Sequence, residues 1–291
     1  MELISNYMRD DKLRHALNGL TQKTFCFDFE GWVTGGYFEG DYIPYSFIED
    51  GKILANVSAN RMQFMQNGVM KNYIQLGTVM TDEAYRKQGL AGKLIKHVVE
   101  TYEKNCDGIY LFGNLDSLGF YRKMGFKEIL QYSCSVKKEF LPNAAAAGFA
   151  AVDPEDKAMK EKYMDAVRNS AVNSSLEQIN KFGLQLFYTS SLEGIFYAED
   201  IDCFISLDQD GDTLFLNSVI SRNKVSLKDI LDRLEGNATQ IKLGFTPLEE
   251  DLSMCDLAVY DGADDYRLFY IGDEIKSIEK EKLYFPEYSH A

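Results

Sequence analysis

Residues Thr78–Glu100, TVMTDEAYRKQGLAGKLIKHVVE, decide the fold of this chain. An alternating apolar segment ends in a short polar turn, and a loop flanked by glycine then leads directly into an amphipathic helix. The helix is expected over about residues 90–104, with one buried face made of Leu90, Leu94, Ile95, Val98 and Val99. The first amides of a helix have no partner within the helix, and its dipole places positive charge beside them. The loop is therefore a candidate anion site.

The side chains around this loop support an anion site. Gly89 lets the backbone approach a ligand closely, and Ala91 and Gly92 keep the first helical turn free of bulky groups. No acidic residue occurs between Glu83 and Glu100, and four basic residues do: Arg86, Lys87, Lys93 and Lys96. In a chain of net charge −14, this local excess of positive charge favours a site for a negatively charged ligand. Diphosphate is a common occupant of such a site.

The charge of the chain is uneven. Residues 1–154 hold 18 acids and 17 bases, a net charge of −1, and residues 155–291 hold 27 acids and 14 bases, a net charge of −13. A nucleic-acid partner needs a basic face and is not expected. The acidic half would attract a cationic partner, or would simply be a solvated surface.

Other features bear on the compartment. The five cysteines are odd in number and form no C-x-x-C pair, which favours free thiols, a cytoplasmic protein and no zinc site. No membrane span and no signal peptide are expected. The sequence leaves room for a homodimer.

The break in composition at residues 141–156 predicts two domains, 1–140 and 157–291, joined by a linker. In the first domain we expect a helix at 11–25 and three antiparallel strands over 42–81, with hairpin turns at Asp50-Gly51 and Asn67-Gly68. A strand at 108–114, a short helix at 117–125 and a strand at 126–138 follow.

The second domain is expected to repeat this order. We expect helices near 159–168 and 176–182, then strands at 184–190, 194–199, 202–208 and 213–221, a helix at 226–236 and a strand at 239–246. This order resembles that of the first half without its glycine loop. A duplicated fold whose second copy has lost the ligand site is therefore predicted.

The loop is neither a Walker loop nor a dinucleotide fingerprint, because the required glycine spacings are absent. Its pattern, Arg86-Lys87-Gln88-Gly89-Leu90-Ala91, resembles the loop of the GNAT superfamily of acyl-CoA-dependent N-acetyltransferases. A second signature, N…FYRKMGF, follows at the family's spacing, with Asn114, Phe120, Tyr121, Gly125 and Phe126. The resemblance covers about residues 42–137. It implies an α+β protein with a mixed, mostly antiparallel sheet flanked by helices and a second, degenerate GNAT-like domain.

The resemblance also implies a site for acetyl-CoA as co-substrate, with no metal. The residues it places beside the cofactor are Val79, Met80, Thr81, Arg86, Lys87, Gln88, Gly89, Leu90, Ala91, Gly92, Asn114, Ser117 and Tyr121. Backbone groups of residues 79–81 would stabilise the developing oxyanion. Tyr121 would donate a proton to the leaving thiolate, because a phenol is protonated at neutral pH; the alternative is a ring that only packs. Ser117 either contacts the cofactor or caps a helix.

The base that deprotonates the amine is not given by the family pattern. Many members place a glutamate on the strand before the loop, and here Gln75 stands at that position, which cannot act as a base. The remaining candidates for this base are water, a more distant carboxylate and the carboxylate of Ala291. The segment Phe25–Phe38 would hold the acceptor, through Asp28, Glu30 and Trp32, by charge and cation–π attraction. Alternatively its rings fill the core and its acids face solvent.

These features predict an enzyme that moves an acetyl group from acetyl-CoA to a primary amine of a small cationic molecule, by direct attack in a ternary complex. The missing carboxylate at Gln75 also allows a different class of protein, an acyl-CoA-binding sensor or regulatory module without catalysis. Transfer to oxygen and longer acyl donors are not excluded by the sequence.

Overall fold

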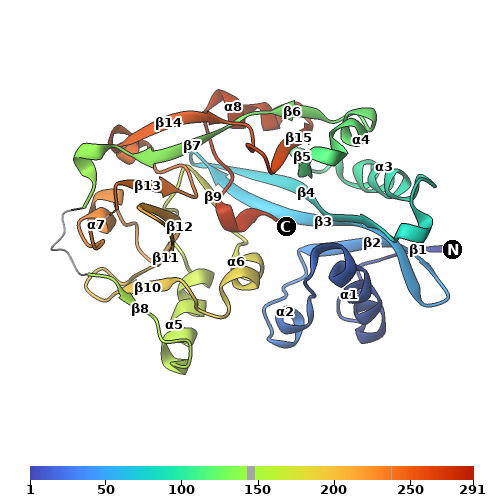
Figure 1. The fold of residues 1–291 in the computed structure, drawn as a ribbon, viewed down its shortest axis with the longest axis horizontal. Helices are drawn as coiled ribbons and strands as arrows, with labels where there is room; N and C mark the ends of the chain where they lie inside the picture. The colour runs from blue at the N-terminus through green and yellow to red at the C-terminus, as the bar shows by residue number, and fades with distance from the viewer. Residues whose placement is uncertain (143–147, 237) are drawn as a thin grey trace.

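The computed structural model describes residues 1–142, 148–236 and 238–291, and two mixed sheets with helices on their faces form the molecule (Figure 1). The helices are α1 (Asp11–Phe25), α2 (Glu30–Thr34), α3 (Leu90–Tyr102), α4 (Leu118–Lys123), α5 (Lys157–Arg168), α6 (Phe182–Thr189), α7 (Leu227–Leu231) and α8 (Ser277–Lys280). The strands are β1 (Glu2–Ser5), β2 (Tyr42–Glu49), β3 (Lys52–Gln66), β4 (Val69–Thr81), β5 (Gly108–Asn114), β6 (Lys127–Ile129), β7 (Gln131–Val136), β8 (Ala150–Ala151), β9 (Leu176–Gln178), β10 (Ile195–Ala198), β11 (Cys203–Asp210), β12 (Thr213–Ser221), β13 (Gln240–Leu243), β14 (Cys255–Tyr260) and β15 (Tyr266–Ile271).

The first sheet has the order β1-β2-β3-β4-β5-β15-β6. Only β4 and β5 run parallel, and the other neighbouring pairs are antiparallel. The two tight hairpins lie where the sequence predicts them. Asp50 and Gly51, and then Asn67 and Gly68, have positive φ angles, which the short connections between twisted strands require.

The second sheet repeats the same plan. Its order, β8-β10-β11-β12-β13-β7-β14, has one parallel pair, β12 with β13, at the equivalent position. In both sheets the next-to-last strand in this order comes from the other half of the chain. β7 lies between β13 and β14, and β15 lies between β5 and β6. The first half therefore gives β7 to the second sheet, and the second half gives β15 to the first sheet, where its short strand β9 also pairs with β3.

This exchange bears on the predicted domains. The division into residues 1–140 and 157–291 stays a prediction, but the two sheets do not follow it, because β7 and β15 each belong to the sheet of the other half. Part of the predicted linker, residues 143–147, lies outside the described residues. The predicted fold class, a mixed sheet flanked by helices with a second sheet of the same plan, is confirmed.

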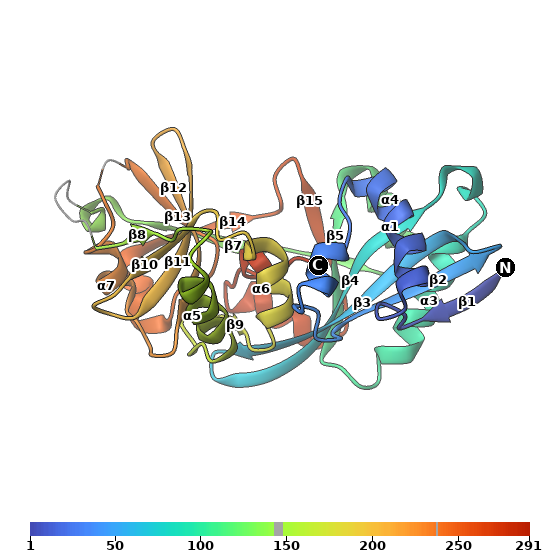
Figure 2. The ribbon, with the colours of Figure 1, turned by 90° about the horizontal axis from the view of Figure 1, so that it is seen from below.

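Helices cover both faces of the first sheet (Figures 1 and 2). On one face α3 and α4 pack over Ile74, Leu76 and Leu111, and Val57 is fully buried beneath them. On the other face α1 and α2 form a core with Ile53. Beside that core lies the C-terminal segment, whose Phe285 is fully buried among Phe64, Tyr73 and Tyr110.

Three predicted elements are wrong. The single strand expected at 126–138 is two strands, β6 in the first sheet and β7 in the second. Residues 176–182 do not form a helix, because β9 (Leu176–Gln178) pairs with the end of β3. Residues 184–190 do not form a strand, because Phe182–Thr189 is helix α6. Buried positions at 182, 186 and 189 have helical spacing, but short apolar runs suit both structures and only the tertiary contacts decide between them.

Because each sheet needs a strand from the other half, we predict a single cooperative unfolding transition for the whole chain. Phe269 on β15 is fully buried against Tyr121 of the first half, so Phe269→Ala should cost about 3–5 kcal/mol. Calorimetry should show one transition that moves to lower temperature. Two separate transitions, with only one of them shifted, would contradict the coupling of the halves.

Candidate functional site

The site begins where β4 leaves β5. The two strands pair only from Tyr73–Gln75 to Gly108–Tyr110, so the later part of β4 has no partner strand on that side. A bulge against β3 follows, and Thr78 there has a left-handed φ of 41°. Four hydrogen bonds hold Thr78. Its hydroxyl lies 2.7 Å from the Tyr42 hydroxyl and donates to Ser58 Oγ at 2.8 Å, and Asn56 Nδ2 donates to the Thr78 carbonyl at 3.0 Å and to its hydroxyl at 3.2 Å.

The residues predicted to contact the acyl donor follow this bulge along β4. Val79 and Thr81 are half-buried, and Val79 packs toward α3 and α4. Met80 is buried on the opposite face, in the core under α1. Because β5 has diverged, the free edge of β4 at residues 79–81 can offer backbone groups to a ligand, as the resemblance implies.

The predicted diphosphate loop is exposed and open. Lys87 and Gly89 both have left-handed backbone conformations, with φ of 63° and 76°. Gly89 is the N-cap of α3, and no side chain caps this helix start. Among the described residues, no group accepts a hydrogen bond from the amides of residues 87–92. These amides can therefore bind an anion, with the exposed Arg86, Lys87 and Gln88 around them.

Tyr121 lies on α4 with its ring against β5. A Cβ added at Gly113 would come within 2.8 Å of that ring, so glycine makes this contact feasible. The ring also packs on Phe126 and Phe269. Burial raises the pKa of Tyr121 to about 12, so the phenol is protonated at neutral pH. The geometry agrees with a packed ring and with a proton donor.

The remaining two predicted cofactor residues lie at the end of β5. Asn114 is its last residue and is exposed, and the Ser117 hydroxyl donates to the Asn114 carbonyl at 2.8 Å. The serine therefore closes the turn into α4. Ser117 stands at the N-cap position of α4, but its side chain makes no capping hydrogen bond, so the helix cap foreseen as the alternative is not formed by its hydroxyl. Its role at a cofactor stays a prediction.

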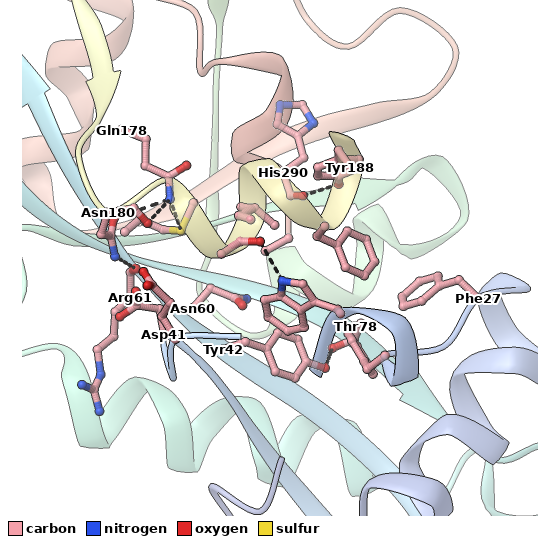
Figure 3. A pocket seen from close by; sticks show the side chains of 18 of the residues that line it. Phe27, Asp41, Tyr42, Asn60, Arg61, Thr78, Gln178, Asn180, Tyr188 and His290 are labelled. Carbon is pink, nitrogen blue, oxygen red and sulfur yellow. Dashed lines mark hydrogen bonds between the residues drawn. The ribbon is translucent and has the colours of Figure 1, made fainter. Parts of the chain in front are cut away.

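A cavity of about 230 Å³ opens on the other face of the first sheet (Figure 3). Thr78 and Asn60 form its floor, and α6 from the second half forms the opposite wall. Its lining is mainly aromatic: Phe25, Phe27, Phe29, Trp32, Tyr42, Phe187 and Tyr188. Two carboxylates, Glu39 and Asp41, also line it.

The residues predicted to bind the acceptor are only partly assembled there. Trp32 lines the cavity, and its indole donates to the Gly183 carbonyl at 2.7 Å. Asp28 is exposed and Glu30 is bonded to Arg14 and Asn18; neither lines the cavity. Hydrogen bonds from Arg14 lower the pKa of Glu30. The Glu30 carboxylate therefore links α2 to α1.

The side-chain carboxylates and the α6 residues that line the cavity were not predicted from the sequence. Glu39 pairs with Arg168, whereas Asp41 has no salt bridge among the described residues. Burial raises the pKa of Asp41. Phe187 and Tyr188 on α6 were hidden because that helix was predicted as a strand. The only available signal was Asp41 beside Tyr42 at the start of a strand.

The C-terminal segment closes the cavity above the point where the strands diverge. Gln75, predicted at the position of the family's glutamate, is fully buried, and its Oε1 accepts the amide of Ala291 at 2.9 Å. His290 stacks on Phe112 with ring centroids 3.9 Å apart, and burial lowers the pKa of His290 to about 4. Its carbonyl accepts a hydrogen bond from the Tyr188 hydroxyl. Ala291 is thereby held beside β4.

Comparison with known proteins identifies the family of the first half. The model of the Acetyltransferase (GNAT) family matches residues 14–126, which include the loop and both sequence motifs. Residues 14–126 therefore form a GNAT acetyltransferase domain, as their motifs predict. A search of curated proteins found no match.

Solved structures share the fold over nearly the whole chain. A conserved protein of unknown function from Enterococcus faecalis V583, described as a probable N-acyltransferase, has a TM-score of 0.58 and 14% identity, over 95% of this chain and 74% of its own. A GCN5-related N-acetyltransferase from Kribbella flavida has a TM-score of 0.54 and 14% identity, over 92% and 71%. Eis1 from Mycobacterium abscessus has a TM-score of 0.52 and 10% identity, over 92% and 73%.

Within residues 1–142, 148–236 and 238–291, no helix combines the length and the apolar character needed to cross a membrane. No three or more His, Cys, Asp or Glu residues among them are grouped as metal ligands.

Replacement of Gly89 tests the anion loop. Gly89→Ala places a Cβ on a residue with a φ of 76°, and we expect the loop to shift and coenzyme A affinity to fall about tenfold, equivalent to about 1.4 kcal/mol. Isothermal titration calorimetry measures this. Gly68→Ala is the matched control, because its φ is 80° in a distant hairpin with equally open space. Equal affinity in both variants would remove the loop from the binding site.

Replacement of Gly77 tests the position of the C-terminal segment. A Cβ at Gly77 would overlap the carbonyl of Ala291 and approach Asn60 Nδ2 to 3.1 Å. Gly77→Ala should therefore release residues 286–291, which hydrogen exchange would report as faster exchange there. Gly31→Ala, in open space on α2, should leave the exchange unchanged. Unchanged protection in Gly77→Ala would mean that the segment does not contact β4.

Proposed function

We propose that this protein transfers an acetyl group from acetyl-CoA to a primary amine of a small, cationic acceptor by direct attack in a ternary complex. One observation carries the proposal. The loop with open amides near Gly89 follows residues 79–81 of β4 along the chain, and the aromatic cavity is lined by Thr78, which precedes them on the same strand. A donor bound at the loop and an amine in the cavity would therefore approach the same free strand edge.

The chain's groups can then act in order. The amides of residues 87–92 bind the diphosphate, and the free edge of β4 at residues 79–81 orients the thioester and stabilises the oxyanion. The neutral amine attacks the thioester carbon, forming a C–N bond and a tetrahedral oxyanion. Collapse of this intermediate breaks the C–S bond, and the thiolate takes a proton from the Tyr121 hydroxyl. The products are the amide and free coenzyme A. The proton that the attacking nitrogen loses to the base returns to Tyr121 through solvent, so no net proton is released from the neutral amine.

The proton acceptor for the amine is the least constrained part of this mechanism. Gln75 has no basic group. The carboxylate predicted at Ala291 stays our proposal, and it is supported by the hydrogen bond that places the Ala291 backbone 2.9 Å from Gln75 Oε1. Solvent water or a more distant carboxylate is the other route that the sequence leaves open.

A non-catalytic acyl-CoA sensor is the alternative, and the amide at Gln75 is the observation that favours it. Release of free thiol from acetyl-CoA, followed with a panel of primary amines, separates the two functions. Thiol release above the rate in buffer supports the enzyme. Coenzyme A binding without release by any amine supports the sensor.

Two further predictions belong with this proposal. All five cysteines are free thiols, which fits the cytoplasmic location predicted from the sequence. Formation of a homodimer also stays a prediction.

Tyr121→Phe tests the proton donor. It removes one hydroxyl and keeps the ring that packs on Gly113, so kcat should fall at least tenfold while coenzyme A affinity stays within about twofold. Because the pKa of Tyr121 is about 12, its titration should not limit the rate of the unmodified enzyme below pH 10. Steady-state kinetics and calorimetry measure these quantities. Tyr163→Phe, at a buried tyrosine of the second half, is the control. Equal loss of turnover and binding would assign Tyr121 a packing role only.

A further inference from the structure

The lining of the cavity restricts which amine could be the acceptor, an argument that rests on the proposed function. Its rings come from three places in the sequence: the segment before and within α2, the start of β2, and α6. They pack against one another, with centroids of Phe29 and Tyr42 4.9 Å apart and those of Trp32 and Phe187 5.6 Å apart. The wall is therefore continuous, and it presents ring faces and edges. The amides of Asn60, Gln178 and Asn180 also line the cavity, but each already donates a hydrogen bond within the protein.

This wall disfavours a hydrophilic acceptor. A sugar hydroxyl or a polyamine nitrogen that loses its water against rings needs a new partner, and leaving it without one costs free energy. The Trp32 indole N–H is already used by the Gly183 carbonyl. The cavity volume of about 230 Å³ lies below the usual range of about 300–1,000 Å³ for drug-sized ligands. A small molecule with an apolar body fits these properties.

The charged side chains in the cavity further restrict the class of acceptor amine. Glu39 is compensated by Arg168, which approaches from α5. Asp41 has no salt bridge among the described residues, although Arg61 also lines the cavity. Figure 3 shows the Arg61 guanidinium directed away from the other labelled side chains, with Asp41 next to Asn180. Asn180 forms a hydrogen bond with Asp41, and the Arg61 charge acts on it without a salt bridge among the described residues. This half-buried carboxylate is therefore still a favourable partner for a ligand ammonium group.

The positions of Asp41 and Thr78 set the direction of the ligand. In Figure 3 Asp41 lies with Arg61 and Asn180 on one side of Tyr42, and Thr78 lies on the other side. Thr78 is next to the free edge of β4, where the acyl group would be transferred. An ammonium bound at Asp41 would thus be a group other than the amine that reacts.

We propose that the acceptor is a small amine with an aromatic or similarly bulky apolar body and a second cationic group, which Asp41 binds at the end of the cavity remote from Thr78. The aromatic wall selects the body, Asp41 selects the second charge, and the reacting amine faces β4. Asp41 is thus a specificity-determining residue.

Four probe amines separate the two features of this ligand. Para-xylylenediamine has a ring and two amines, benzylamine has the ring and one amine, and hexamethylenediamine and hexylamine are the corresponding pair without a ring. We expect para-xylylenediamine to have the highest kcat/KM, about tenfold or more above benzylamine, as a charged hydrogen bond would give. Spermidine and kanamycin serve as hydrophilic comparisons and should be poorer still.

Asp41→Asn keeps the shape of the side chain and removes its charge. It should abolish the advantage of para-xylylenediamine over benzylamine while leaving benzylamine turnover within about twofold. Asp212→Asn, at an exposed carboxylate in the hairpin between β11 and β12, is the matched control and should change neither value, because Asp212 does not line the cavity. Phe187→Leu should reduce the preference for ringed over straight-chain diamines.

A binding measurement keeps this inference apart from the proposed function. Trp32 is the single tryptophan and lines the cavity, so its fluorescence reports ligand binding without turnover. If no amine releases thiol but para-xylylenediamine still binds more tightly than its three relatives, the enzyme proposal fails and the ligand class stands. Preference for hexamethylenediamine, spermidine or kanamycin overturns the ligand class. An unchanged diamine advantage in Asp41→Asn, or no binding of the ringed amines, also overturns it.

Discussion

The separation of β4 from β5 is the constraint on which the site depends. The two strands share only the pairs from Tyr73–Gln75 to Gly108–Tyr110, and β4 then bulges at Thr78. A threonine in the left-handed region is strained by about 1–3 kcal/mol. Hydrogen bonds with Tyr42, Ser58 and Asn56 offset this strain and fix the bulge. The loop at Gly89 follows from the direction in which the bulged strand leaves the sheet.

The exchange of strands explains why the aromatic cavity can form on this sheet. β7 leaves the first half for the second sheet, and β15 returns to complete the first. The chain after β15 is therefore already beside β5, and Phe285 and His290 pack on Tyr110 and Phe112. The second half also brings α6 over the face opposite α3. Two elements that a lone GNAT domain would lack thus form the wall and the cover of the cavity.

The sequence predicts the parts of this structure whose signals are local. The helix at 11–25, the strands at 108–114 and 213–221 and the loop before α3 depend on spacing, turn residues and helix starts within a few residues. The exchange of β7 and β15 could not be predicted, because either strand satisfies the alternation required in either sheet. The cavity residues Asp41, Phe187 and Tyr188 were missed because their meeting depends on how α6 packs.

The amide at Gln75 shows how this site differs from a pattern with a carboxylate on the same strand. Gln75 is fully buried, and a carboxylate there would lose its water without a cation to compensate it. An uncharged amide avoids that cost and still accepts the Ala291 amide, which anchors the C-terminal segment. Anchoring and charge are therefore divided between different residues. Gln75 holds the cover of the cavity, and Asp41, half-buried at its wall, provides the negative charge at a position where a ligand ammonium can replace water.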